Sequence, residues 1–122
     1  MVNQKRQSVV LIISTFPDEE SIAKIAKDLI VIKKLCACIN LTKVRSIYDW
    51  NSKLEDHEEF VVFFKTTKLR ANRLKDEIKK VHPYSVPEIL EIKIDDVSKT
   101  YLSWLVGTTT TTSTSATTRS YK

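Results

Sequence analysis

The most reactive side chains in this sequence are two cysteines that lie one residue apart, Cys36 and Cys38. Alternate residues of a strand point to the same side, so this spacing puts both sulfurs on one face of a strand. Two thiolates on one face can hold a soft metal ion such as copper. Cysteine is also among the most buried residue types, so the simpler interpretation is that the pair fills a core. A disulfide at this spacing is geometrically poor, and free thiols are typical of a reducing compartment.

The two histidines, His57 and His82, are the only imidazoles in the chain. His57 lies in an acidic run at residues 55–59, where we expect a solvated side chain. His82 follows a predicted helix and precedes Pro83, and two interpretations stay open. It bonds to the terminal carbonyls of that helix, or it lines a ligand cleft. No nucleophile has an identifiable base beside it, so the sequence predicts a binding protein and not an enzyme.

Two further residues, Trp50 and Lys65, are unusual for their positions. Trp50 lies at a predicted turn, where an aromatic ring is normally part of a core, an interface or a ligand platform, and we favour an interface. Lys65 follows a buried apolar run, and it is either a partly buried cation facing an anion or a solvated lysine. The single glycine, Gly107, excludes Gly-rich phosphate loops and the dinucleotide-binding fingerprint.

The elements that position these residues follow from the spacing of apolar side chains. Runs rich in β-branched residues and alternating runs predict strands, and apolar residues at helical spacing predict helices. Strands are expected at residues 8–15, 36–49, 54–66 and 88–94, and helices at 18–34, 68–81 and from 98 onward. Thr66 or Thr67 and then Ser98 can cap the last two helices. Two right-handed βαβ-like halves in this order predict a four-stranded antiparallel sheet with helices on one face.

The second and third predicted strands form a hairpin that is longer than usual. The turn at residues 49–53 joins them, and Asn51 can take a positive φ there. A long hairpin projects beyond a small domain, and its exposed edges invite pairing with another subunit.

Length and charge exclude several classes of protein. The 122 residues suit one domain, and the net charge of +5 includes four bases in the terminal segments, at Lys5, Arg6, Arg119 and Lys122. The rest of the chain holds 16 bases and 15 acids, so we expect no nucleic-acid partner. No apolar run approaches the roughly 18 residues of a membrane span, so we expect no membrane partner and a cytoplasmic protein.

Five segments together carry a resemblance to a known family. They are Thr15–Ser21, Leu35–Asn40, Val44–Trp50, Phe64–Thr67 and His82–Ile89. In this order and spacing they resemble the CutA family of divalent-cation-tolerance proteins, over roughly residues 9–105. The resemblance implies an α+β, ferredoxin-like fold and a tight homotrimer formed through the long hairpins. It also implies a cytoplasmic protein linked to copper tolerance and copper binding, with no established enzymatic activity.

The resemblance also implies which residues form the sites. Cys38 matches the cysteine of the family, and copper would bind there, with Cys36 or His82 as a further ligand. The hairpin aromatics Tyr48 and Trp50 would lie at the trimer interface. CutA trimers look like the PII signalling proteins, which bind small effectors between subunits. The corresponding clefts would be lined by Trp50, Lys65, Tyr84, Glu59 and Glu88, a mixture that suits an anionic or zwitterionic effector.

The chain departs from the family pattern at three positions. Cys36 replaces a small residue, so a site with two thiols would be peculiar to this chain. Ser52 replaces a frequent turn glycine, which leaves Asn51 to supply the special backbone conformation. Ser85 replaces a frequent glutamate. We expect a CutA-like domain at residues 1–107 and a solvated Thr/Ser-rich tail at residues 108–122. A trimer that serves only as a structural scaffold is the third alternative, beside metal binding and effector binding.

Overall fold

The structure is a computed structural model that describes residues 8–110. Four strands form one antiparallel sheet in the order β2-β3-β1-β4. The elements follow one another as β1 (Val9–Phe16), α1 (Glu19–Lys27), the π-helix η2 (Asp28–Ile32), β2 (Cys38–Trp50), β3 (Lys53–Thr67), α2 (Lys68–Val81), β4 (Ile89–Lys93) and α3 (Lys99–Thr108). The predicted α+β, ferredoxin-like βαββαβ architecture with a long hairpin and a C-terminal helix is therefore confirmed.

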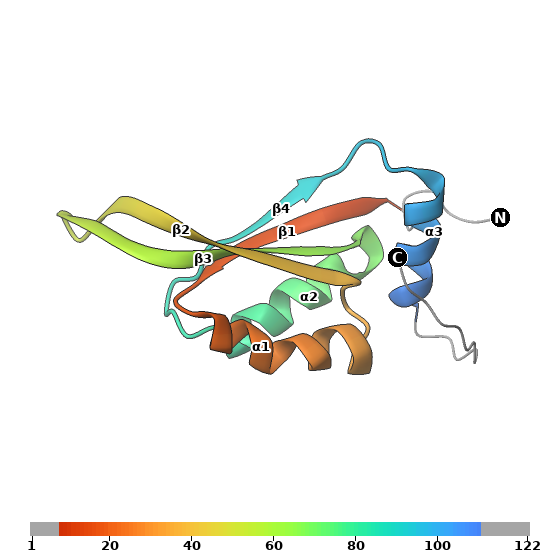
Figure 1. Cartoon of the computed structure of the whole chain (residues 1–122), viewed down its shortest axis with the longest axis horizontal. Helices are drawn as coiled ribbons and strands as arrows, with labels where there is room; N and C mark the ends of the chain where they lie inside the picture. The colour runs from red at the N-terminus through yellow and green to blue at the C-terminus, as the bar shows by residue number, and fades with distance from the viewer. Residues whose placement is uncertain (1–7, 111–122) are drawn as a thin grey trace.

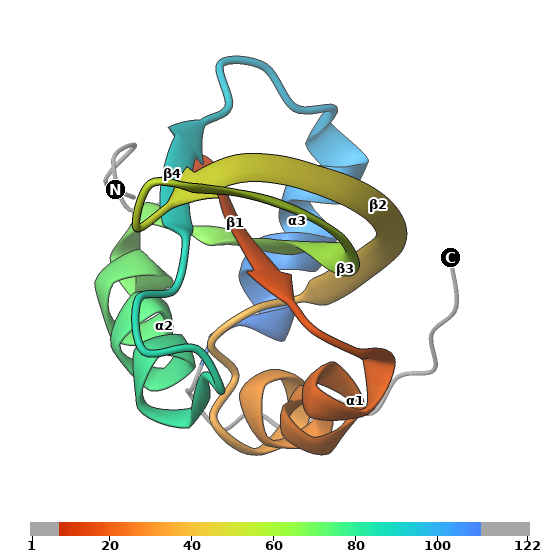
Figure 2. The same cartoon turned by 90° about the vertical axis from the view of Figure 1, so that its left-hand side faces the viewer.

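Helices α1 and α2 cover the same face of the sheet, as the two views in Figures 1 and 2 show. The main core lies between these layers. Alternate residues of β1, Val10, Ile12 and Phe16, point into it and are almost completely buried. They pack with the apolar stripe that the helices and β3 supply, which comprises Ile22, Leu29, Val62, Phe64, Ala71, Leu74 and Ile78. The helix residues of this set recur at helical spacing, so they form one apolar side that packs α1 and α2 against the sheet.

The first helix begins at a strong cap and ends in a wider turn. Asp18 accepts hydrogen bonds from the backbone nitrogen of Ser21 at 2.8 Å and from its hydroxyl at 2.9 Å. The helical segment then continues as η2, where the nitrogen of Lys33 donates to the carbonyl of Asp28 at 2.8 Å. Lys34 leaves the helix with a positive φ of 52°. The predicted helix over residues 18–34 is thus present, but its last turn is a π-turn.

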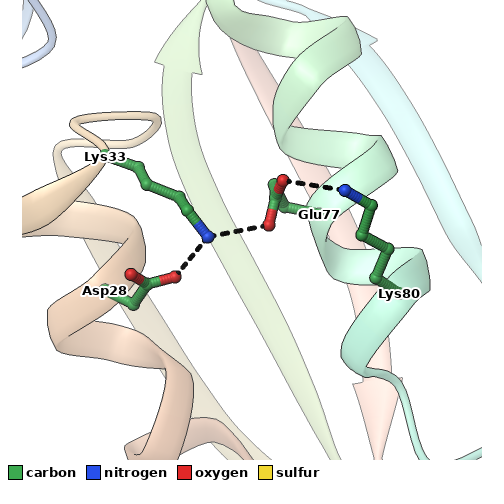
Figure 3. Close-up of polar contacts among 4 residues, drawn as sticks. All are labelled: Asp28, Lys33, Glu77 and Lys80. Carbon is green, nitrogen blue, oxygen red and sulfur yellow. Dashed lines mark hydrogen bonds and ion pairs between the residues drawn. The ribbon is translucent and has the colours of Figure 1, made fainter.

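An ion-pair network connects the end of the first helix to α2 (Figure 3). The ammonium of Lys33 lies 2.8 Å from the carboxylate of Asp28 and 3.0 Å from that of Glu77, which also lies 3.3 Å from Lys80. These pairs are partly exposed to solvent, so they orient the two helices while the buried apolar stripe supplies most of the stability.

The hairpin turn needs two residues in the left-handed region. Asn51 has a φ of 56° and Ser52 a φ of 63°, and Trp50 pairs with Lys53 across the turn. Two positive φ values are typical of a type I′ hairpin turn. The prediction that Asn51 alone supplies the special conformation is therefore wrong, because a serine adopts it as well.

Helix α3 packs at the end of the molecule opposite the hairpin tip (Figure 1). Its Leu105 is buried against Val9 and Ala37 in a second, smaller apolar cluster. Thr109, just after α3, is also buried, and its carbonyl accepts a hydrogen bond from Arg70 at 2.9 Å. The packed part of the chain therefore runs slightly beyond residue 107, and most of the predicted tail lies outside the described residues.

The two predicted cap residues lie at the helix starts but do not cap them through their side chains. Thr67 and Ser98 occupy the N-cap positions of α2 and α3, but neither side chain makes a capping hydrogen bond. The hydroxyl of Thr66 instead donates to the buried carbonyl of Leu35 at 2.7 Å, which fixes the loop that enters β2 against β3.

Candidate functional site

Most of the sheet face that looks away from α1 and α2 carries apolar side chains, and no helix in the described part of the chain covers it. Only the end near Val9 is covered, by α3. The strand register places apolar residues of three strands there, namely Leu11, Ile13, Val61, Phe63, Leu90 and Ile92. On the edge strand β4, Leu90 is 50% exposed and Ile92 is 44% exposed. We call this surface the open face.

A groove of about 900 Å³ lies where the open face meets the hairpin. One wall is the hairpin, with Tyr48, Trp50 and Glu55, and the other is the loop at residues 83–88. The floor is formed by β1 and β3. The lining residues are Thr15, Ser46, Ile47, Tyr48, Trp50, Glu55, His57, Glu59, Val61, Pro83, Tyr84, Ser85, Val86, Pro87 and Glu88.

Two hydrogen-bonded pairs set the polar geometry of this groove. The hydroxyl of Tyr84 donates to the carboxylate of Glu59 at 2.9 Å, and Glu59 is only 6% exposed. Tyr48 lies 2.8 Å from Nε2 of His57, and Nδ1 of His57 lies 3.1 Å from the carbonyl of Glu58. A carbonyl only accepts, so Nδ1 carries a proton and Nε2 can accept from the Tyr48 hydroxyl. His57 is therefore engaged on both nitrogens.

His82 fixes the loop of the groove to β1. Its ring stacks on Phe16 with centroids 4.2 Å apart, and Nε2 donates to the carbonyl of Thr15 at 2.9 Å. Its Nδ1 accepts the backbone N–H of Tyr84 at 3.0 Å. Burial lowers the pKa of His82, which favours the neutral ring. The lone pair on Nδ1 already accepts a hydrogen bond, so this imidazole has a structural role: it holds the loop against β1. It does not line the groove.

The two cysteine sulfurs lie in different surroundings. Cys36 is completely buried in the main core, before the strand begins, whereas Cys38 is half-buried at the first residue of β2. The prediction of one shared strand face is therefore wrong, because residues 35–37 form a buried loop. Burial, with a smaller contribution from Cys38, raises the pKa of the Cys36 thiol to about 12. Cys36 thus stays protonated at neutral pH, and Cys38 carries the accessible sulfur.

The comparison with known proteins identifies the family. The chain matches the sequence model of the CutA1 divalent ion tolerance protein family over residues 10–108. The chain belongs to this family. The divalent-cation tolerance protein CutA of Pyrococcus horikoshii is 41% identical over 101 residues, which cover 83% of this chain and 98% of the relative.

Solved CutA structures share the fold. CutA1 from Pyrococcus horikoshii superposes with a TM-score of 0.78 at 40% identity, covering 83% of this chain and 98% of that one. The CutA of Archaeoglobus fulgidus, described as a periplasmic divalent cation tolerance protein, gives 0.79 at 34% identity, covering 84% and 99%. In the described part of this chain, none of the helices has the length and apolar character needed to cross a membrane.

Within a single CutA1 chain, the predicted metal ligands do not come together. Among the described residues, no three His, Cys, Asp or Glu side chains gather closely enough to hold a metal ion. Cys38 pairs with Lys65, which in turn faces Leu11 of β1, whereas His82 contacts Thr15. Leu11 and Thr15 are four residues apart on β1, which corresponds to roughly 13 Å along the strand. Cys38 and His82 therefore lie at opposite ends of the sheet.

Most of the predicted cleft residues do come together in this CutA1 chain. Trp50, Tyr84, Glu59 and Glu88 line the groove, whereas Lys65 is half-buried on the same face but outside it. Other lining residues were not predicted from the sequence, among them Glu55, His57, Pro83 and Val86. Counting outward from the hairpin turn pairs Tyr48 with Glu55 and Ser46 with His57. This register could have predicted from the sequence that Glu55 and His57 lie beside the hairpin residues of the groove.

Proposed function

We propose that the chain forms a homotrimeric divalent-cation-tolerance protein that binds copper or another divalent metal ion in the response to metal ions. The observation that carries the proposal is an apolar sheet face, mostly uncovered within residues 8–110, that holds a half-buried thiol in a CutA1-family fold. The proposal includes a cytoplasmic location and no enzymatic activity. It also includes no nucleic-acid partner, in keeping with the near balance of bases and acids outside the terminal segments.

The open face and the hairpin support assembly. Apolar patches of this kind mark interaction surfaces in folded proteins, because water solvates them poorly. The edge strands β2 and β4 also carry backbone groups that can pair with another chain. The hairpin aromatics Tyr48 and Trp50, 42% and 46% exposed, supply large contact areas of the type that interfaces favour. Three copies that cover each other's open faces would bury much of this apolar surface and leave clefts between neighbouring subunits.

The thiol chemistry supports Cys38 as the metal ligand. A soft ion such as Cu(I) prefers sulfur, and it binds the thiolate form. Cys36 is buried as a thiol and His82 is engaged on both nitrogens, so Cys38 is the best of the three candidates. In this proposal the further ligands come from neighbouring subunits, because one chain does not gather them.

Native mass spectrometry of the reduced protein with one equivalent of copper per chain tests both parts. We expect a trimer that gains discrete copper masses. Cys38→Ser should lose the copper, whereas the matched control Cys36→Ala should keep it. A monomer would refute the assembly, and copper retained by Cys38→Ser would refute the ligand.

The groove favours a second candidate function, the binding of a small effector as in PII proteins. It combines an aromatic wall with carboxylates and hydroxyls, the mixture of apolar surface and few polar groups that ligand sites show. A thermal-shift panel of small charged metabolites tests it, with the melting temperature as the readout. No shift from any class of compound would refute effector binding without affecting the trimer.

A further inference from the structure

We infer that the groove between the hairpin and the loop at residues 83–88 binds an organic cation, an ammonium group with apolar substituents. The inference rests on the second candidate function above and names its class of ligand. It also replaces the anionic or zwitterionic effector expected from the sequence, which depended on Lys65 lining the same cleft.

The charge of the groove selects a cation. Its described lining holds three carboxylates, Glu55, Glu59 and Glu88, and neither lysine nor arginine. The one imidazole in this lining is His57, which is engaged with Tyr48 and with the carbonyl of Glu58. An anion placed here would meet like charges without a compensating base, whereas a cation would meet charges of opposite sign in a partly enclosed site.

The buried carboxylate of Glu59 gives this charge a fixed position. Glu59 is 6% exposed, and the hydrogen bond from Tyr84 at 2.9 Å holds its Oε1 in place. A carboxylate has acceptor positions on both oxygens, so this one bond leaves Glu59 able to receive a ligand. Among the described residues, Glu59 forms no ion pair with a lysine or arginine. A bound cation would supply the missing counter-charge.

The aromatic wall explains why the cation is organic. Tyr48, Trp50 and Tyr84 line the same groove, and the faces of such rings attract ammonium groups. Pro83, Val86 and Pro87 add apolar surface from the loop. A bare metal ion gains little from aromatic and proline side chains, and no described cluster of three ligands is present to hold one. An alkylated ammonium uses both kinds of surface.

Titration with choline tests the inference in the full-length protein in its native oligomeric state. The control probe is 3,3-dimethylbutan-1-ol, which has nearly the same shape and no charge. Trp50 lines the groove, so its fluorescence reports binding, and calorimetry checks the affinity. We expect choline to bind at least about tenfold more tightly than the alcohol, because only choline gains the ionic and cation–π attraction. Equal affinities, or no binding of choline, would overturn the inference.

Matched variants locate the site. Glu59→Gln keeps an acceptor for Tyr84 but removes the charge, and it should weaken choline binding by about tenfold. Glu55→Gln, on the less buried hairpin wall, should also weaken binding, and it covers the case in which Glu59→Gln fails to fold. Glu58→Gln is the control, because Glu58 points to the opposite side of the same strand and should leave binding unchanged. If neither groove variant alters choline binding, the assignment is wrong.

Two further outcomes separate this inference from the proposals on which it rests. Binding of an anionic metabolite, without choline binding, would refute the cation and keep the effector function. A copper-binding trimer that takes up neither choline nor any metabolite would refute both groove proposals and keep the metal-binding trimer.

Discussion

Replacing Ser52 with glycine is expected to stabilise the fold, although the side chain it removes is exposed. Ser52 sits at a φ of 63°, where the Cβ of an L-residue approaches the following carbonyl. That conformation costs about 1–2 kcal/mol for an ordinary residue and little for glycine. Glycine loses about 0.5–1 kcal/mol more backbone entropy on folding, so the net gain is about 0.5–1 kcal/mol. Asn51, the other positive-φ residue of the turn, already tolerates this region and should gain less from glycine.

Urea denaturation of Ser52→Gly and the parent chain, at one fixed protein concentration, measures this gain as a shift in the midpoint. The control is Ser103→Gly, an exposed serine inside α3, where the helical φ favours serine over glycine. The control should therefore be destabilised by about 0.5 kcal/mol. If Ser52→Gly is also destabilised, the backbone strain at the turn is smaller than the entropy that glycine loses on folding, and the expected gain is refuted.

Three further outcomes follow from the buried groups. His82→Ala should lower the free energy of unfolding by about 2 kcal/mol, because it removes the stacking on Phe16 and the hydrogen bonds of the ring with Ser14, Thr15 and Tyr84; an unchanged urea midpoint would contradict this structural role. Burial lowers the pKa of His82 below its ordinary value of 6.5, so the unfolded chain binds more protons and stability should fall as the pH drops from 6.5 toward the folded-state pKa. This loss should be smaller in His82→Ala, as urea midpoints between pH 7.5 and 5.5 would reveal. Iodoacetamide labelling followed by mass mapping should modify Cys38 before Cys36, because Cys36 is fully buried and burial raises the pKa of its thiol, and the reverse order would refute the placement of the two thiols.

The sequence predicted the helices and the order of elements along the chain well, because buried residues recur at the period of each element. The helix at residues 68–81 was predicted with its observed bounds, since Ala71, Leu74 and Ile78 recur at helical spacing and Pro83 lies just beyond the end. The wide last turn of the first helix was not predictable in this way. A π-turn changes the spacing by only one residue within the last turn, which the apolar pattern does not reveal.

The candidate site was predicted only in part, because it depends on long-range register and on the path of loops. Trp50 and Tyr84, which the sequence analysis expected in one cleft, both line the groove, although 34 residues separate them in the numbering of the chain. Cys36 was misplaced because strand alternation was extended across a loop. Lys65 was expected in the cleft from the family resemblance, but it lies outside the groove, which occupies the other end of that strand face.

The hairpin extends well beyond the strand that supports it. Strand β1 pairs with β3 only from Phe60 to Thr67, so the chain between Val44 and Glu59 is a ribbon whose two strands pair only with each other in the sheet. Two-stranded ribbons are marginally stable in water. The proposed trimer would supply the packing that this ribbon lacks, so amide hydrogens in the ribbon should exchange at rates that fall as protein concentration rises, while exchange in β1 should not depend on concentration. Folding of the ribbon and association of subunits would then be a single kinetic event. The late phase of refolding would therefore be second or third order in the concentration of the chain.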